Sequence, residues 1–227
     1  MSLTQQDYIA AAEKLGVEVA AVRAVASVES SGKGFFQNGK PVILYERHIF
    51  YKELTLKRTT LARNRVKLEN PTLVGTQLDA KIAVGVKQAT NEITIIASQN
   101  PGICNQSTGG YVGGVKEYDR LEKAKAIDEE CALRSCSWGA FQVMGFHAEF
   151  LGFKNVTEMV AAAGTDVGQL DIFIRFIQKN PSLLKALKAK AWPEFARLYN
   201  GPAFAKNQYD TKLTAAFNQF TNNSTLT

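Results

Sequence analysis

A glutamate stands where an apolar helical pattern ends, at Glu29 in the stretch VASVESSGKGFF (residues 25–36). The last turn of a helix carries partial negative charge on its free carbonyl groups, which disfavours an ionised carboxylate. Partial burial acts in the same direction and raises the pKa of the carboxyl group. A carboxylic acid that keeps its proton near neutral pH can act as a general acid. The Ser and Gly residues over 30–34 leave room for a polymeric substrate to approach.

Other catalytic chemistries find less support in the residue types present. Cys131 or Cys136 could pair with His147 as in a cysteine peptidase or amidase. A zinc amidase needs a third ligand and a motif such as His-Glu-x-x-His, and the chain has only two histidines, His48 and His147. We therefore expect no metal and no cofactor. The third cysteine, Cys104, makes an odd count, which favours reduced thiols and a reducing compartment over a disulfide framework.

The composition indicates a globular protein with a positive charge. The 227 residues are 45% hydrophobic and 21% charged, with a net charge of +6, which favours anionic partners. Residues 51–67 carry six basic side chains and one acidic side chain, Glu53. The simplest interpretation is that they form a solvated helix face. No nucleic-acid-binding motif accompanies them, so we expect no nucleic acid. No apolar run reaches the roughly 20 residues of a membrane span, and no secretory signal is evident. We expect one domain, no stable membrane insertion, and synthesis in a cytoplasm.

Helical periodicity dominates the chain. Thr4 is suited to cap a first helix that ends near Gly16, and a second helix is predicted over about 18–30. The segment 41–51 begins as a short strand and continues as a helix. The Gly- and Asn-rich segment 91–114 is expected to be mostly loop.

The second half of the chain continues in the same way. One helix is predicted over about 115–135, and Ser137 is suited to cap a new helix. Two further helices are predicted, one ending at Pro181 and the other at Gly201. The elements together indicate a mainly α fold with a small β element.

Three separated motifs accompany Glu29 and resemble those of lysozyme-like glycosidases. They are VESSGKGF, SWGAFQVMG (137–145) and LYNGP (198–202), and goose-type lysozymes and soluble lytic transglycosylases carry similar elements. With PVILYERHIFYK, EYDRLEKA and FIRFI added, residues 4–217 resemble the N-acetylmuramidase domain of phage endolysins. The resemblance implies an α+β lysozyme-like fold, a helical bundle around a sugar cleft, without a separate peptidoglycan-binding domain.

The resemblance implies that Glu29 protonates the glycosidic oxygen between N-acetylmuramic acid and N-acetylglucosamine. Hydrolases commonly use a second carboxylate, and Glu46 in LYERH is the best candidate, with an ion pair to Arg47 or another basic residue as its alternative role. The segment after Glu29, SSGKGFFQNGK, contains no acid. A lytic transglycosylase, which would use Glu29 alone as acid and base and release a 1,6-anhydro sugar, therefore stays open.

Substrate binding is assigned to polar and aromatic residues of the same motifs. Gln142 could bind an acetamido group or position water, and Tyr199 and Asn200 could hold the muramyl side. Tyr111 and Tyr118 could stack on sugar faces. Ser137 is also assigned to substrate binding because it begins the motif SWGAFQVMG. The partners expected are peptidoglycan strands and, indirectly, a holin that permeabilises the inner membrane, with a monomer acting in the periplasm after lysis begins. A basic cell-wall-binding module is the non-enzymatic alternative.

Overall fold

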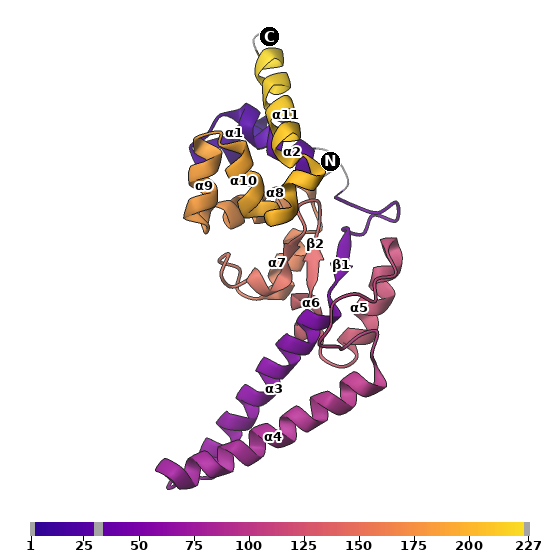
Figure 1. The fold of residues 1–227 in the computed structure, drawn as a ribbon, viewed down its shortest axis with the longest axis vertical. Helices are drawn as coiled ribbons and strands as arrows, with labels where there is room; N and C mark the ends of the chain where they lie inside the picture. The colour runs from indigo at the N-terminus through magenta and orange to yellow at the C-terminus, as the bar shows by residue number, and fades with distance from the viewer. Residues whose placement is uncertain (1–2, 30–33, 225–227) are drawn as a thin grey trace. The chain divides into compact units, whose positions relative to one another are not determined.

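The structure is a computed structural model that describes residues 3–29 and 34–224. It is mainly helical with one small sheet (Figure 1), as the sequence predicts. The helices are α1 Gln5–Leu15, α2 Val19–Glu29, α3 Arg47–Glu69, α4 Gly75–Gln99, α5 Glu117–Lys125, α6 Glu129–Arg134, α7 Val156–Ala162, α8 Asp166–Gln178, α9 Pro181–Lys188, α10 Trp192–Asn200 and α11 Tyr209–Ser224. The strands are β1 Ile43–Tyr45, β2 Cys136–Trp138 and β3 Val143–Met144. Short 3₁₀ helices cover Gly114–Lys116, Gly145–His147 and Pro202–Asn207.

The chain folds into two compact units. The first unit takes in the described residues of 1–42, 138–143 and 147–227, and the second takes in 43–137 and 144–146. The chain passes between the units before β1, within β2, within β3 and within the 3₁₀ helix Gly145–His147. The three strands form one sheet in the order β1–β2–β3.

In the first unit, local signals set the ends of the helices. Thr4 forms a capping box with Asp7 at the start of α1, and Gly16 ends that helix in the left-handed conformation. The buried face of α2 consists of small and β-branched residues such as Val22, Ala24 and Val25, which let this helix pack against α1 and α11. This packing fixes the helix whose last residue is Glu29.

Aromatic rings form the core beneath α8 and α10. Phe141 and Phe173 stack with their ring centroids 4.3 Å apart, and Tyr199 meets Phe173 edge to face. Phe195 stacks on Tyr199, and Trp192 lies edge to face against Phe195. These contacts fix the end of α10, where Tyr199 and Asn200 lie.

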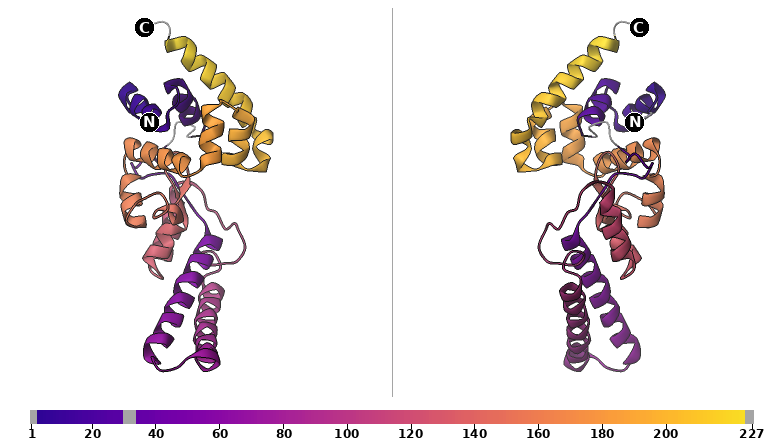
Figure 2. Two further views of the ribbon diagram at one scale, coloured as in Figure 1. Left: turned by 90° about the vertical axis from the view of Figure 1, so that its left-hand side faces the viewer. Right: turned by 90° about the vertical axis from the view of Figure 1, so that its right-hand side faces the viewer.

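The second unit contains a long helical hairpin made by α3 and α4 (Figures 1 and 2). The two helices pack against each other and are joined by residues 70–74. The core of the unit includes Tyr45 of β1, Phe50 and Leu54 of α3, Ile93 of α4 and Leu121 of α5, all buried.

One local prediction held only in part, and two were wrong. Residues 91–99 belong to α4 and only the rest of 91–114 lacks α-helix, because Ile93 packs into the core and tertiary burial outweighs the local composition. The helix predicted over 115–135 is two helices, because Asp128 caps α6. The helix predicted to end at Gly201 is likewise two, α9 and α10, with a break at residues 189–191.

Candidate functional site

Glu29 is the last residue of α2, and its carboxylate meets a side chain from the far end of the chain. The Asn200 amide, at the last residue of α10, donates a hydrogen bond of 3.0 Å to Glu29 Oε1. Both residues belong to the first unit, and both side chains are half-buried. The two residues are 171 positions apart in sequence, so only the tertiary fold brings these two motifs together.

Burial raises the pKa of Glu29 from 4.5 to about 7, while the hydrogen bond from Asn200 lowers it. Removing the charged form from water is thus the dominant effect, as expected for a carboxyl group at the end of a packed helix. At neutral pH a large fraction of Glu29 carries a proton. The prediction that this carboxyl group can act as a general acid therefore has a physical basis in its surroundings.

Tyr199 and Gln142 lie in the same unit as Glu29 but hydrogen-bond to the backbone. The hydroxyl of the half-buried Tyr199 donates to the Phe141 carbonyl at 2.9 Å. The Gln142 amide donates to the Gly139 carbonyl at 2.7 Å and the Val42 carbonyl at 3.4 Å. Gln142 also has a φ of 50°, which holds it in a turn conformation uncommon for residues other than glycine. Both side chains therefore shape the turn at 139–142.

Sequence reasoning did not find Gln169 of α8, which connects this turn to Gly34, a residue of the motif that contains Glu29. The buried Gln169 side chain accepts a hydrogen bond from the Ala140 N–H at 2.8 Å and donates to the carbonyls of Gly34, at 3.1 Å, and Ala163, at 2.8 Å. A Cβ atom on Gly139 would lie 2.5 Å from Gln169 Cδ, and one on Gly34 would also clash with the amide. The glycines in these two motifs are therefore required by a buried polar side chain.

Ser30, Ser31 and Gly32, which the sequence places at the approach to Glu29, lie outside the described residues.

Glu46 belongs to the second unit, between β1 and α3. The Tyr111 hydroxyl donates to both of its carboxylate oxygens, at 2.8 and 3.1 Å. His48 Nδ1 lies 3.2 Å from Glu46 Oε2 but has no hydrogen-bond partner in the described structure. The alternative ion pair with Arg47 is not formed, since the Arg47 guanidinium donates to backbone carbonyls, including those of Ser107 and Thr108. Glu46 and Tyr111 thus form a polar pair.

A buried ion pair holds the loop that carries Tyr111. Glu117, with no exposed surface, accepts hydrogen bonds from the N–H groups of Val112 at 2.7 Å and Gly113 at 2.9 Å, and from Arg120 at 2.7 Å. Burial opposes ionisation, yet these donors hold the pKa of Glu117 below its usual value. Arg120 also donates to the Tyr45 carbonyl at 2.8 Å. The loop is therefore fixed by its charged neighbours.

Tyr118 and Ser137 also lie in the second unit. Tyr118 is half-buried on α5, and burial raises its pKa to about 12. Ser137 is buried in β2 and caps no helix, so the prediction of a helix start there was wrong. The segment forms two short strands around a Gly-containing turn. Its residues therefore do not follow a helical period.

The three cysteines are buried and unbridged, which confirms the prediction of free thiols. Burial raises the pKa of Cys131 to about 12 and that of Cys136 well above its usual value, so neither is a ready thiolate nucleophile. His147 packs its ring against Phe150 and Phe176. These surroundings give the cysteine peptidase alternative no support.

No group of three His, Cys, Asp or Glu side chains within residues 3–29 and 34–224 could hold a metal ion. No helix in these same ranges combines the length and the apolar character needed to cross a bilayer.

Comparisons with known proteins place these observations in a family context. A family model described as N-acetylmuramidase matches residues 18–221. Among solved structures, the crystal structure of the endolysin of a Burkholderia phage, AP3, is similar to this chain, with 39% sequence identity and a TM-score of 0.80. The match covers 97% of this chain and 72% of the phage protein. No curated protein sequence matches the chain.

Proposed function

Since the chain belongs to the N-acetylmuramidase family, we propose that it is a phage endolysin that degrades peptidoglycan as a lysozyme-type glycoside hydrolase. The bond cleaved is the β-1,4 linkage between N-acetylmuramic acid and N-acetylglucosamine. Glu29 is the general acid. The observation that carries this assignment is the pKa of about 7 that burial gives to Glu29, in the motif that resembles the catalytic motif of lysozyme-like enzymes.

In this mechanism the protonated Glu29 donates its proton to the glycosidic oxygen as the bond breaks. Asn200 keeps the carboxyl group oriented through its hydrogen bond at 3.0 Å. Gln142 and Tyr199 complete the substrate side of the first unit, where each side chain donates a hydrogen bond to a carbonyl of the turn at 139–142. Glu46 is the proposed second carboxylate, and Tyr111, Tyr118 and Ser137 are the proposed substrate residues of the second unit.

A lytic transglycosylase is the second candidate, favoured by the lack of any acidic residue over 30–40. In that reaction Glu29, after acting as the acid, would act as the base that takes the proton of the muramyl 6-hydroxyl. The 6-hydroxyl oxygen would attack the anomeric carbon. Glu46 would then have a structural role, consistent with its two hydrogen bonds from Tyr111.

Mass spectrometry of soluble fragments from purified peptidoglycan tests the two reactions. Fragments with a reducing-end N-acetylmuramic acid are expected for hydrolysis, and fragments lighter by one water and ending in a 1,6-anhydro sugar indicate transglycosylation. Glu29→Gln should abolish fragment release while retaining co-sedimentation with purified sacculi. Glu13→Gln, which removes an exposed carboxylate on α1, is the matched control. Normal lysis by Glu29→Gln would refute the site assignment, and binding without lysis by the wild-type chain would favour a basic wall-binding module.

The cellular setting follows from the same proposal. The protein, acting as a monomer, accumulates in the host cytoplasm and reaches the wall once a holin-type protein permeabilises the inner membrane. Expression in a bacterial host should leave the cells intact until the inner membrane is permeabilised, and lysis should then follow. Lysis without permeabilisation would contradict the proposed route.

A further inference from the structure

The helical hairpin, residues 47–99, carries most of the net charge of the protein. It contains nine Lys and Arg residues and four Asp and Glu residues, a net +5 of the +6 found in the whole chain. A positive charge so concentrated in one structural element favours anionic partners at that element.

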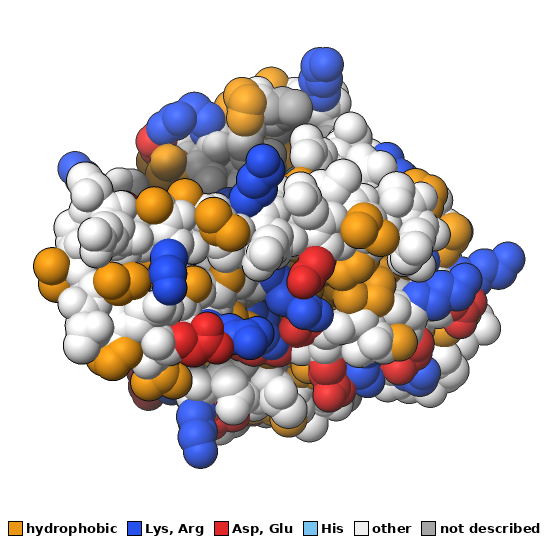
Figure 3. All heavy atoms as spheres, turned by 90° about the horizontal axis from the view of Figure 1, so that it is seen from below, with side chains coloured by type: hydrophobic (Ala, Val, Ile, Leu, Met, Phe, Trp, Pro, Cys, Tyr) orange, Lys and Arg blue, Asp and Glu red, His pale blue; other side chains and the backbone are white. Residues whose placement is uncertain are grey.

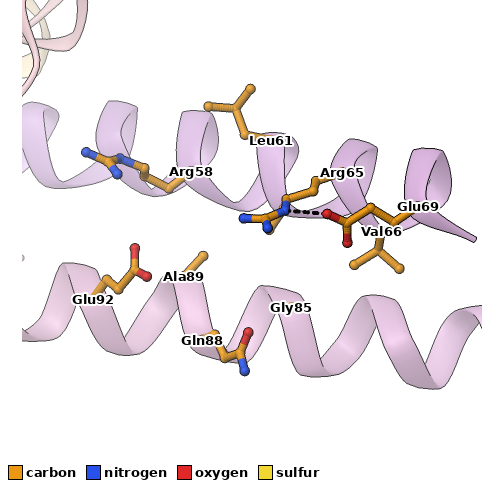
Figure 4. A pocket seen from close by; sticks show the side chains of 10 residues that line it. Arg58, Leu61, Arg65, Val66, Glu69, Gly85, Gln88, Ala89 and Glu92 are labelled. Carbon is orange, nitrogen blue, oxygen red and sulfur yellow. Dashed lines mark hydrogen bonds and ion pairs between the residues drawn. The ribbon is translucent and has the colours of Figure 1, made fainter.

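The groove between the two helices does not contain this excess. It has a volume of about 530 Å³, and Figure 4 shows Arg58 and Arg65 of α3 together with Glu69 and Glu92. Arg65 and Glu69 are joined by an ion pair of 2.8 Å. The charges that line the groove are thus balanced, so the excess positive charge lies elsewhere on the hairpin.

Three of the remaining cations lie on one exposed face of α3. At 100° per residue, Lys52, Leu56, Arg63 and Lys67 fall within an arc of roughly 60° and span about 22 Å along the helix. All four side chains are exposed. Lys52, Arg63 and Lys67 form no ion pair with any residue in the described ranges, in contrast to Lys57, which pairs with Asp128 at 2.9 Å. This row of unpaired cations is called the basic stripe below.

Large apolar side chains are exposed on the same hairpin. Leu68 is 82% exposed and Val74 is 77% exposed, and both lie at the end where α3 and α4 are joined. Leu56, within the basic stripe, is 60% exposed. Figure 3, which views the molecule from the lower end of Figure 1, shows Lys and Arg side chains standing out from the surface beside apolar ones. Cations mixed with exposed apolar side chains are typical of surfaces that adsorb to membranes.

We propose that the hairpin adsorbs to an anionic lipid surface through the basic stripe and the apolar side chains at its end. Lipid phosphate groups neutralise Lys52, Arg63 and Lys67, while Leu68 and Val74 enter the headgroup region. An anionic glycan strand would satisfy the three cations but would leave the apolar side chains in water, so lipid accounts for both features. The hairpin lies on the membrane and does not span it.

Co-sedimentation of the full chain with lipid vesicles tests this inference. We expect binding to vesicles of phosphatidylglycerol and phosphatidylethanolamine, weak binding to phosphatidylcholine, and loss of binding as the salt concentration rises. Each Lys or Arg near an anionic lipid surface contributes to the free energy of binding. K52Q/R63Q/K67Q should therefore weaken vesicle binding on the order of ten- to hundred-fold. The variant L68S/V74S should weaken binding about ten-fold by removing the apolar contribution.

A matched control separates the stripe from the total charge. K185Q/K188Q/K206Q removes the same charge from exposed lysines of the first unit and should leave vesicle binding within about two-fold of wild type. Circular dichroism confirms that each variant is folded. Equal losses in the two triple variants would overturn the proposal, as would unchanged vesicle binding by K52Q/R63Q/K67Q. Loss of sacculus binding alone would identify the stripe as a peptidoglycan surface instead. Vesicle binding needs no glycosidase activity, so this result is independent of the proposed reaction.

Discussion

Replacing Glu29 by Gln should make the protein more stable at alkaline pH while it abolishes glycan cleavage. Burial raises the pKa of Glu29 to about 7 in the folded chain, against a usual value of 4.5. The folded state therefore holds this proton more tightly than the unfolded state. As pH rises from 4.5 to about 7, the unfolded state loses the proton first and the free energy of unfolding decreases. Above about pH 7 the penalty is complete and constant.

The size of the effect follows from the pKa difference. The full shift corresponds to roughly 3 kcal/mol at 1.36 kcal/mol per pKa unit, and we take about 2 kcal/mol because the half-buried side chain is partly screened by water. Glutamine cannot ionise, and its carbonyl oxygen can still accept the hydrogen bond from Asn200. For a chain of this size, each kcal/mol raises Tm by about 2–4 °C, so Glu29→Gln should raise Tm by roughly 4–8 °C at pH 8.

Differential scanning calorimetry at pH 4 and pH 8 measures this effect directly. At pH 4 both states are protonated, so the variant and wild type should have nearly the same Tm. Glu13→Gln, at an exposed position of α1, should change Tm little at either pH. An equal change of Tm at both pH values, or a lower Tm at pH 8, would refute the account of Glu29 as a carboxyl group with a raised pKa.

Further predictions concern the residues around the two carboxylates. Asn200→Ala removes a donor to the ionised form of Glu29, so the basic limb of the pH profile of kcat/KM should move up by about half to one pH unit; an unmoved limb would exclude the contact from catalysis. Gln169→Leu removes all three hydrogen bonds of a buried amide and should lower the free energy of unfolding by roughly 2–4 kcal/mol, measured by urea denaturation; a change below about 1 kcal/mol would contradict its bridging role. Gly139→Ala should cost about 2 kcal/mol or more in the same assay, because φ is 70° and the added Cβ meets Gln169, whereas Gly102→Ala, with open space around the added atom, is the control. Glu46→Gln should reduce kcat far more than it raises KM if Glu46 acts in the reaction, and a change confined to KM would assign it to substrate binding.

Local signals in the sequence determined much of the fold. The Thr4 cap, the Gly16 stop and the apolar face of α2 each depend on residues within a few positions, so they predict helix ends correctly without knowledge of the tertiary structure. The location of Glu29 at the end of α2 follows from the same kind of signal. The prediction that Glu29 keeps its proton could therefore be made from one short stretch of the sequence.

Tertiary packing decided what local patterns could not. Residues 91–99 became helix because Ile93 found a buried position among partners distant in sequence. The bond between Asn200 and Glu29 and the bridge made by Gln169 each join motifs more than 100 residues apart. The pKa of Glu29 is likewise set by its burial in the folded chain and by the hydrogen bond from Asn200. Desolvation and long-range hydrogen bonds both depend on residues that are far apart in the sequence. Only the folded chain brings these residues together.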